Sequence, residues 1–347
     1  KPAVRSRWLW RLEALAEAAF GEGGAEQLVG DGARLIAIAR ALEPPRAPPP
    51  AGLIPAPKPP AEDQPTRFGA TELDRLIRDP YAVYADRMLR LRPLGRLGEP
   101  PGARELGVAI HAAAHRLAET FAAGVLPNDP AGFLLDAYAD ELRRLGFTPD
   151  AREDQRQRLA EFALQLAEME RRERVTGQVF TEVEGAYELK GLDVPIEIRG
   201  RADRITVEGD EAVILDYKTG SRIPTDAQIA QGLSVQLGAM TLMLESGGFR
   251  GVPAARVRQV AYMKARRKPE RLAPLEAKDP DLTQEELAER TREVLLGWIG
   301  RLRRQGEGWG SGIRREKAAD AGDYDHLARR DEWANVGEED DAGGEDA

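Results

Sequence analysis

The chain has 347 residues, of which 42% are apolar and 31% charged, and this is enough apolar material for one large or two modest domains. It contains no cysteine, which excludes disulfides, thiol catalysis, iron–sulfur clusters and cysteine-based zinc sites. The net charge is -9, but the last ten residues hold six acids and no base, so the rest carries only -3. An acidic total therefore does not exclude a nucleic-acid partner, whereas the lack of any apolar run of about 18 residues excludes a transmembrane helix.

Residues 1–43 are predicted to be helical, because apolar residues recur at helical spacing before and after a glycine-rich break at Gly21–Gly24. Two short helices cannot bury their apolar faces alone, so we interpret this piece as the remnant of an upstream module. Residues 44–65 are predicted to be a linker, since nine of the seventeen residues from Pro44 to Pro60 are proline. The chain begins at Lys1 rather than Met, so we expect it to be a fragment of a longer protein.

Residues 66–335 are predicted to form one domain that begins with helices. Thr71, with an acid three residues later at Asp74, is a plausible N-cap, and Pro80 is expected to start a further helix. Three more helices are predicted at 104–123, 130–145 and 151–172.

From Val179 onward the apolar period changes from 3.6 to 2. The pattern predicts strands at 179–189, 194–207 and 212–217, then a helix at 226–245, a strand at 256–264 and a helix at 282–304. This order indicates a mixed α/β (α+β) fold with a small central sheet flanked by helices. Residues 336–347 are predicted to be an acidic, disordered tail.

Two aspartates are expected to face each other in the predicted sheet. If residues 208–211 form a hairpin with a two-residue loop, Asp203 lies opposite Asp216, with Cβ atoms about 5 Å apart. Lys218 lies two residues beyond Asp216 and therefore on the same face. Carboxylates this close raise one another's pKa, and a hard cation such as Mg²⁺ relieves the repulsion. Two acids, a lysine and a metal are the components of a phosphodiester-hydrolysing site.

Asp203 together with Asp216-Tyr-Lys218 resembles the PD-(D/E)xK nuclease superfamily, in its RecB-like branch, which implies a restriction-endonuclease-like fold. That branch has a histidine on an upstream helix, which Leu106-Gly-Val-Ala-Ile-His111 matches. It also has a downstream Q-x-x-x-Y helix, in which Gln236 fits but Met240 replaces the tyrosine.

The resemblance implies a set of roles for these residues. His111, Asp203, Asp216 and the main-chain carbonyl of Tyr217 would hold Mg²⁺, for which Mn²⁺ can substitute. Lys218 would position the attacking water or stabilise the phosphate, and Gln236 would contact the substrate or the lysine. Glu182 or Glu184, at the start of a strand, could also reach the site, whereas His115 is interpreted as a neighbour and His326 as structural.

The segment from Thr71 to Leu91 resembles the entry to the nuclease domain of the AddB family, the helicase-like/nuclease subunits of bacterial AddAB break-resection complexes. The resemblance covers roughly residues 66–335, and residues 1–43 resemble the end of the helicase-like part. Many members carry a four-cysteine iron–sulfur cluster, so this chain resembles the cluster-free alphaproteobacterial form. We hypothesise that packing of aromatic residues closes the domain in place of the cluster; these residues are Tyr81, Tyr84, Tyr324 and Trp333.

This family resemblance implies a double-strand break repair function. The substrate would be single-stranded DNA from unwound duplex ends, the partner an AddA-like helicase-nuclease subunit, and the location the bacterial cytoplasm at the nucleoid. Two alternatives stay open, a non-catalytic DNA-binding or scaffold domain and a stand-alone Cas4-like or phage-type exonuclease.

A basic run could supply the contacts to DNA. Residues 250–271 hold eight bases and one acid, which is typical of a phosphate-binding surface or simply of a solvated one. The residues predicted to bind DNA are Arg256, Arg258, Lys264, Arg266, Arg267 and Lys268.

Overall fold

A computed structural model describes residues 4–28, 32–43, 53–94, 97–124, 127–220, 223–265, 284–304, 307–312 and 322–333. The chain forms two compact units, of which the second spans Leu53–Asn335. Within its described residues, the first unit contains three helices rather than the two predicted, α1 (Arg7–Phe20), α2 (Gly24–Leu28) and α3 (Gly32–Leu42). α1 ends where predicted, because Gly21 adopts a φ of 83° that other residues avoid.

The described end of the proline-rich segment, residues 53–60, belongs to the second unit. Pro55 and Pro57 accept main-chain hydrogen bonds from Ser311 and Trp309, and a short 3₁₀ turn follows at Ala61–Asp63. Residues 44–52 and the predicted acidic tail at 336–347 lie outside the described residues.

Five strands form the central sheet: β1 (Arg67–Gly69), β2 (Gln178–Leu189), β3 (Ile196–Glu208), β4 (Glu211–Lys218) and β5 (Arg256–Lys264). β3 is the central strand and pairs with β2 along nearly its whole length. On its other side β3 pairs first with β1, at residues 197–199, and then with β4, at residues 204–208. Among the described strands, residues 200–203 of β3 therefore have no partner on that side.

The β3–β4 hairpin has the predicted register. Glu208 pairs with Glu211 across a two-residue loop, and the ladder continues to Arg204 and Leu215. The ladder stops one pair short of Asp203 and Asp216, whereas β4 stays paired on its other edge with the parallel strand β5 as far as Lys218. The two aspartates therefore lie where the hairpin strands separate.

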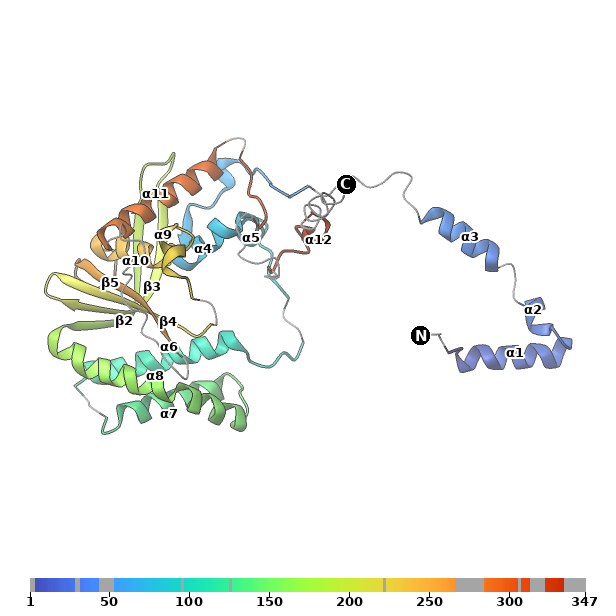
Figure 1. Ribbon diagram of the computed structural model, residues 1–347, viewed down its shortest axis with the longest axis horizontal. Coiled ribbons are helices and arrows are strands. Elements are labelled where there is room, and N and C mark those ends of the chain that lie inside the picture. Colours follow the sequence, from blue (N-terminus) through green and yellow to red (C-terminus); the bar gives the residue numbers. More distant parts are fainter. Residues whose placement is uncertain are drawn as a thin grey trace, which may run out of the picture. The chain divides into compact units, whose positions relative to one another are not determined.

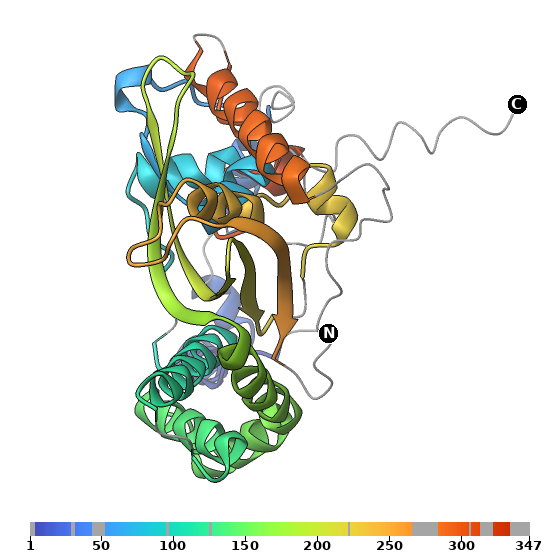
Figure 2. The same ribbon diagram turned by 90° about the vertical axis from the view of Figure 1, so that its left-hand side faces the viewer.

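Helices cover both faces of the sheet in both views (Figures 1 and 2). One face packs against α4 (Ala70–Arg78), α10 (Gln236–Glu245) and α11 (Gln284–Arg303). The other packs against α6 (Ala103–Ala122) and α8 (Pro149–Thr176), and α7 (Pro130–Arg144) packs on these two helices from outside. Each side has its own buried apolar cluster, so the predicted α/β (α+β) class with a small mixed sheet flanked by helices is confirmed.

The single helix predicted at 226–245 is instead two helices, α9 (Asp226–Ala230) and α10. The break falls at Gly232, which has a φ of 69°. β1 was not predicted, because three residues are too few for a periodic signal. None of the helices in the described ranges has the length and apolarity needed to span a membrane.

A small aromatic cluster joins the start of this unit to its end. Tyr81 on α5 (Pro80–Arg87) and Tyr324 share one buried group, with Tyr84 packed against it. The Tyr324 hydroxyl also donates to the main-chain oxygen of Leu91 (2.9 Å). Trp333, the last residue of α12 (Arg330–Trp333), donates its ring N–H to Ala328, a member of the same cluster. These contacts tie the two segments together, as hypothesised for this cysteine-free chain.

Candidate active site

The predicted site residues come together around the gap on β3. Asp203 lies in that gap, and Asp216 and Lys218 lie at the end of β4, which the hairpin places beside it. His111 reaches the site from α6, and Gln236 is the first residue of α10. A further acid, Glu182, enters from β2.

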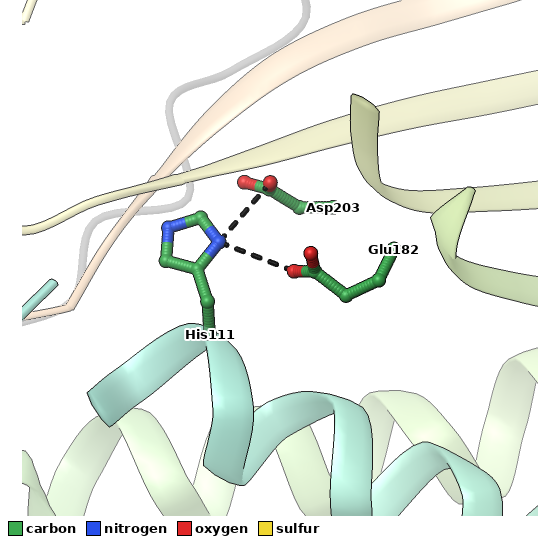
Figure 3. A group of neighbouring side chains, drawn as sticks. All are labelled: His111, Glu182 and Asp203. Atoms are coloured by element: carbon green, nitrogen blue, oxygen red, sulfur yellow. Dashed lines mark hydrogen bonds and ion pairs between the residues drawn. The ribbon is translucent and has the colours of Figure 1, made fainter. Parts of the chain in front are cut away.

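His111, Glu182 and Asp203 form a cluster (Figure 3). The Nδ1 atom of His111 lies 3.1 Å from Asp203 Oδ1 and 3.4 Å from Glu182 Oε1, and one ligand atom from each residue lies within 4.8 Å of the others. Burial by itself lowers the pKa of His111, but the hydrogen bonds and charges of the two carboxylates raise it to about 10. The acids thus favour a positive charge at this position, and oxygen and imidazole donors suit a divalent cation.

Glu182 owes its position to an unusual main-chain conformation. Successive side chains of a strand point to opposite faces, yet Thr181 contacts His115 (2.8 Å) and Glu182 contacts His111, both on α6. This is possible because Glu182 has a φ of 52°, in the left-handed region. Such a conformation costs roughly 1–2 kcal/mol in a residue other than glycine, and such outliers cluster at functional sites.

A second group of side chains surrounds the end of β4. Gln236 donates through Nε2 to Asp216 Oδ1 (2.6 Å) and accepts through Oε1 from Lys218 Nζ (3.0 Å). The main-chain N–H of Tyr217 donates to Asp203 Oδ2 (2.6 Å), which links this group to the histidine cluster. The pKa of Asp216 is raised to about 6, first by burial and then by the charge of Asp203. Two neighbouring carboxylates therefore share this site, as predicted.

The second oxygen of Asp216 is paired with the site lysine. Oδ2 of Asp216 is buried, and the Lys218 ammonium lies 2.8 Å from it. Because a carboxylate oxygen carries two lone pairs, one of them remains for a further cation. Together with the His111, Glu182 and Asp203 cluster, it makes the donor set fit a divalent metal.

Residues 67–311 match the family described as the PD-(D/E)XK nuclease superfamily. The chain belongs to this superfamily. The matched range contains every side chain of the site, from His111 to Gln236, and membership in the superfamily implies a nuclease.

Two curated relatives from Rickettsia match about half of this chain. An uncharacterized protein of Rickettsia bellii (strain RML369-C) is 31% identical over 197 residues, and one of Rickettsia conorii (strain ATCC VR-613 / Malish 7) is 31% identical over 201 residues. Each match covers 53% of this chain but only 22% and 23% of the relatives, so the chain spans less than a quarter of their length. The crystal structure of SSO0001 is 13% identical, with a TM-score of 0.28 over 67% of this chain and 77% of that one, and it adds nothing to the assignment.

A half-buried aspartate, Asp74, holds the glutamine of this site in place. Asp74 of α4 accepts hydrogen bonds from Ser234 Oγ (2.8 Å), Val235 N (2.6 Å) and Gln236 N (3.2 Å) at the start of α10. Its pKa is raised, chiefly because burial disfavours the charged form. The prediction that Thr71 is an N-cap with Asp74 as its acid is therefore wrong.

The start of α4 is capped without Asp74. This helix begins at Ala70, and Glu72 accepts from Gly69 N (3.1 Å). The predicted N-cap at Thr71 lies one residue inside the helix, so the acid three residues later is free to serve another element.

On the opposite face of the sheet, a buried ion network lies directly beside Asp203. Arg204 is fully buried and pairs with Glu170 and Glu173 of α8. Thr206 donates to Glu173 (2.8 Å), and Arg174 donates to Glu170 (2.8 Å). This network fastens α8 to β3, and the sequence signal for it was the pair of glutamates one turn apart on a helix that is otherwise apolar on that face.

A cleft of about 830 Å³ opens onto the histidine cluster. Its walls include His111, His115, Glu182, Arg201 and Arg250. The cleft thus brings two arginines next to the candidate metal ligands. Arg250 is the first base of the predicted basic run, although it is not among the residues predicted individually, and Arg201 lies outside that run.

The predicted DNA-binding residues are distributed differently. Lys264 pairs in register with Lys218 and lies beside the site. Arg256 and Arg258 begin the same strand and form ion pairs with Glu211 and Glu208 at its other end. The structure does not bring these two arginines to the carboxylates, while Arg266, Arg267 and Lys268 lie outside the described residues.

Proposed function

We propose that the chain is a metal-dependent DNA nuclease domain of an AddAB-type helicase-nuclease, which cleaves single-stranded DNA released by unwinding during double-strand break repair. The observation that carries this proposal is that the His111, Glu182 and Asp203 cluster, of which His111 and Glu182 line an open cleft, is linked through Asp203 to the group of Asp216 and Lys218. Carboxylates, an imidazole and a lysine in this arrangement supply what phosphodiester hydrolysis requires.

In this proposal, His111, Glu182 and Asp203 hold Mg²⁺ or Mn²⁺, with Asp216 and the carbonyl of Tyr217 as further candidate ligands. When bound, the ion supplies Lewis acidity toward water and the phosphate oxygens. The donor set contains three carboxylates, which suits hard cations that prefer oxygen ligands.

Lys218 acts on the reacting groups themselves. Its ammonium is held by Gln236 Oε1 and Asp216 Oδ2 and lies over the ring of Tyr262 (5.2 Å to the centroid). Fixed in this way, it can orient the attacking water or stabilise negative charge on the phosphate without reorganising. Gln236 is a positioning residue, because its amide bridges the lysine and the aspartate.

The AddAB-type assignment is supported by the resemblance of the segment from Thr71 to Leu91 and by the aromatic cluster of Tyr81 and Tyr324, which joins the segments that a metal cluster joins in many family members. The helices of the first unit expose large apolar side chains, including Trp8 and Trp10, that a helicase-like module would cover. The proposed partner is an AddA-like subunit, and the proposed location is the bacterial cytoplasm at the nucleoid.

Cleavage of end-labelled strands tests the nuclease. The chain is incubated with single-stranded DNA labelled at the 5′ or the 3′ end, with Mg²⁺, Mn²⁺ or EDTA. Asp216→Ala is the test variant, and Asp154→Ala, an exposed aspartate on α8, is the matched control. We expect metal-dependent cutting that Asp216→Ala abolishes and Asp154→Ala retains, with both variants folded by circular dichroism.

Retained cutting by pure, folded Asp216→Ala would contradict the proposal. If the folded native chain cuts nothing, calorimetric metal titration separates a partner-dependent nuclease, which binds the ion, from a scaffold domain, which does not. Adding an AddA-like subunit then tests the complex.

A further inference from the structure

A second cavity continues from the active-site cleft across the sheet. It has a volume of about 790 Å³ and lies over β2, β3 and the turn at Gly247–Gly251. The two cavities share Glu184, Arg201 and Arg250 as lining residues, so they adjoin at these side chains. We call this second cavity the β2–β3 groove.

The walls of the β2–β3 groove are unusually rich in main chain. Five of its lining residues are glycines, at positions 185, 200, 247, 248 and 251. The glycines at 185 and 248 allow the turn to pack against β2, since a Cβ there would lie 2.5 Å and 2.0 Å from Phe249 and Ala186. At positions 247 and 251 a Cβ would meet no atom closer than 3.6 Å, so these two glycines leave the main chain of the turn open to an extended polymer. Its one aromatic residue, Phe249, is buried and offers no stacking surface.

The turn that carries Arg250 is fixed to the sheet. Ala186 N donates to Gly248 O (3.1 Å), and Arg250 N donates to Glu184 O (2.9 Å). The turn is therefore paired with the edge of β2 by two main-chain hydrogen bonds. A Cβ atom at position 248 would lie 2.0 Å from the oxygen of Ala186, so only glycine allows this approach. Arg250 is therefore held at the junction of the two cavities.

The charges along the groove favour an anion at this junction. Arg250 has no acidic partner among the described residues. Arg201 pairs with Glu182 (3.5 Å), whose side chain is 18% exposed, and with Glu184 (3.3 Å), in a pair that is 58% and 62% exposed. An ion pair exposed on both sides contributes about 0–1 kcal/mol, so a phosphate can replace Glu184 as a partner of Arg201.

We infer that the β2–β3 groove binds the sugar–phosphate backbone of a single DNA strand on its way to or from the active-site cleft, with Arg250 contacting a phosphate at the junction. This inference rests on the proposed function and adds the path of the substrate to it. Contacts to phosphate, without stacking or base-edge groups, make the binding independent of sequence.

Substrate length distinguishes this path from a general effect on catalysis. The test variant is Arg250→Ala, and the control is Arg144→Ala, an exposed arginine on α7 that pairs with Glu141. Each is assayed on a strand of about 20 nucleotides, long enough to follow the groove, and on thymidine 5′-p-nitrophenyl phosphate, which is too short to do so. Binding of the long strand is measured separately by fluorescence anisotropy in EDTA across a salt series.

We expect Arg250→Ala to raise KM for the long strand about fivefold, to leave kcat and the short substrate unchanged, and to reduce the salt slope of binding by about 0.7, the value for one lost phosphate contact. Equal effects on both substrates, or an unchanged salt slope, would overturn the inference. If the native chain cleaves neither substrate, metal titration and the added AddA-like subunit decide the proposed function, while the anisotropy series in EDTA decides separately whether the groove binds DNA, and an unchanged salt slope for Arg250→Ala still overturns the inference.

Discussion

Removing the carboxylate of Asp74 tests whether α10 is positioned from α4. Asp74→Ala removes the acceptor of three hydrogen bonds, which come from Ser234 Oγ and the N–H groups of Val235 and Gln236. Loss of a helix cap costs about 0.5–2 kcal/mol, and each further buried donor left without a partner costs about 1–3 kcal/mol. Part of this loss of stability is offset, because the substitution also removes the cost of keeping a charged carboxylate away from water. Burial raises the pKa of Asp74 for the same reason. We expect a net loss of about 2–4 kcal/mol in the free energy of unfolding.

The same substitution is expected to reach the active site. Gln236 loses its anchor and no longer holds Lys218 and Asp216 at fixed positions, so kcat should fall about tenfold or more. Denaturant unfolding gives the stability, and hydrogen exchange at the Val235 and Gln236 amides reports the cap directly in the metal-free protein.

Two comparisons make the Asp74 test specific. Thr71→Ala changes an exposed residue of the same helix and should alter neither quantity. Asp74→Asn keeps one acceptor oxygen and should fall between the native chain and Asp74→Ala. The reasoning is refuted if Asp74→Ala exchanges these amides no faster than the native chain, or if it keeps full kcat at a temperature where it is folded.

Three further predictions follow from individual contacts. Glu182→Gln should weaken Mn²⁺ binding in calorimetry about tenfold or more, since it removes one anionic ligand. The control Glu184→Gln changes a residue of the same strand that is 62% exposed and should leave Mn²⁺ affinity unchanged, and equal affinities of the two variants would refute the role of Glu182. Arg204→Met should lower the free energy of unfolding by about 3 kcal/mol, because it removes the fully buried positive charge shared by two glutamates of α8, although Glu170 keeps Arg174 and Glu173 keeps Thr206 as partners; a loss below about 1 kcal/mol would refute this reasoning. Lys218→Ala should reduce kcat about a hundredfold or more while metal affinity stays unchanged, and a parallel loss of affinity would mean that the lysine acts on the metal ligands instead.

Much of the site could be predicted because it depends on one hairpin. The pairing of Glu208 with Glu211 follows from the two-residue loop, and the alternation along β3 and β4 then places Asp203, Asp216 and Lys218 near one another. Gln236 of the downstream helix also lies at the site. It contacts Lys218, and this contact is one of the two roles expected for it. Met240 is buried in the core, in keeping with the absence of a tyrosine at that position.

Other features of the site could not be predicted from local sequence patterns. Glu182 faces α6 only because of its positive φ, a main-chain conformation that strand periodicity does not reveal. The basic run indicated Arg256 and Arg258, but charge along the chain says nothing about which end of a strand meets the site. Arg201 and Arg250 are far apart in sequence and meet only at the cleft.

The sequence by itself therefore determined the order of the elements, the hairpin register and the pair of aspartates, because periodicity and turn chemistry act between residues close in the chain. Tertiary structure alone decided that Glu182 joins His111, that Asp74 caps a helix 160 residues away and that Arg250 stands beside the cleft. These contacts join segments that are far apart in the chain, and no local sequence pattern links such segments. The contacts form only when helices and strands pack around the common sheet.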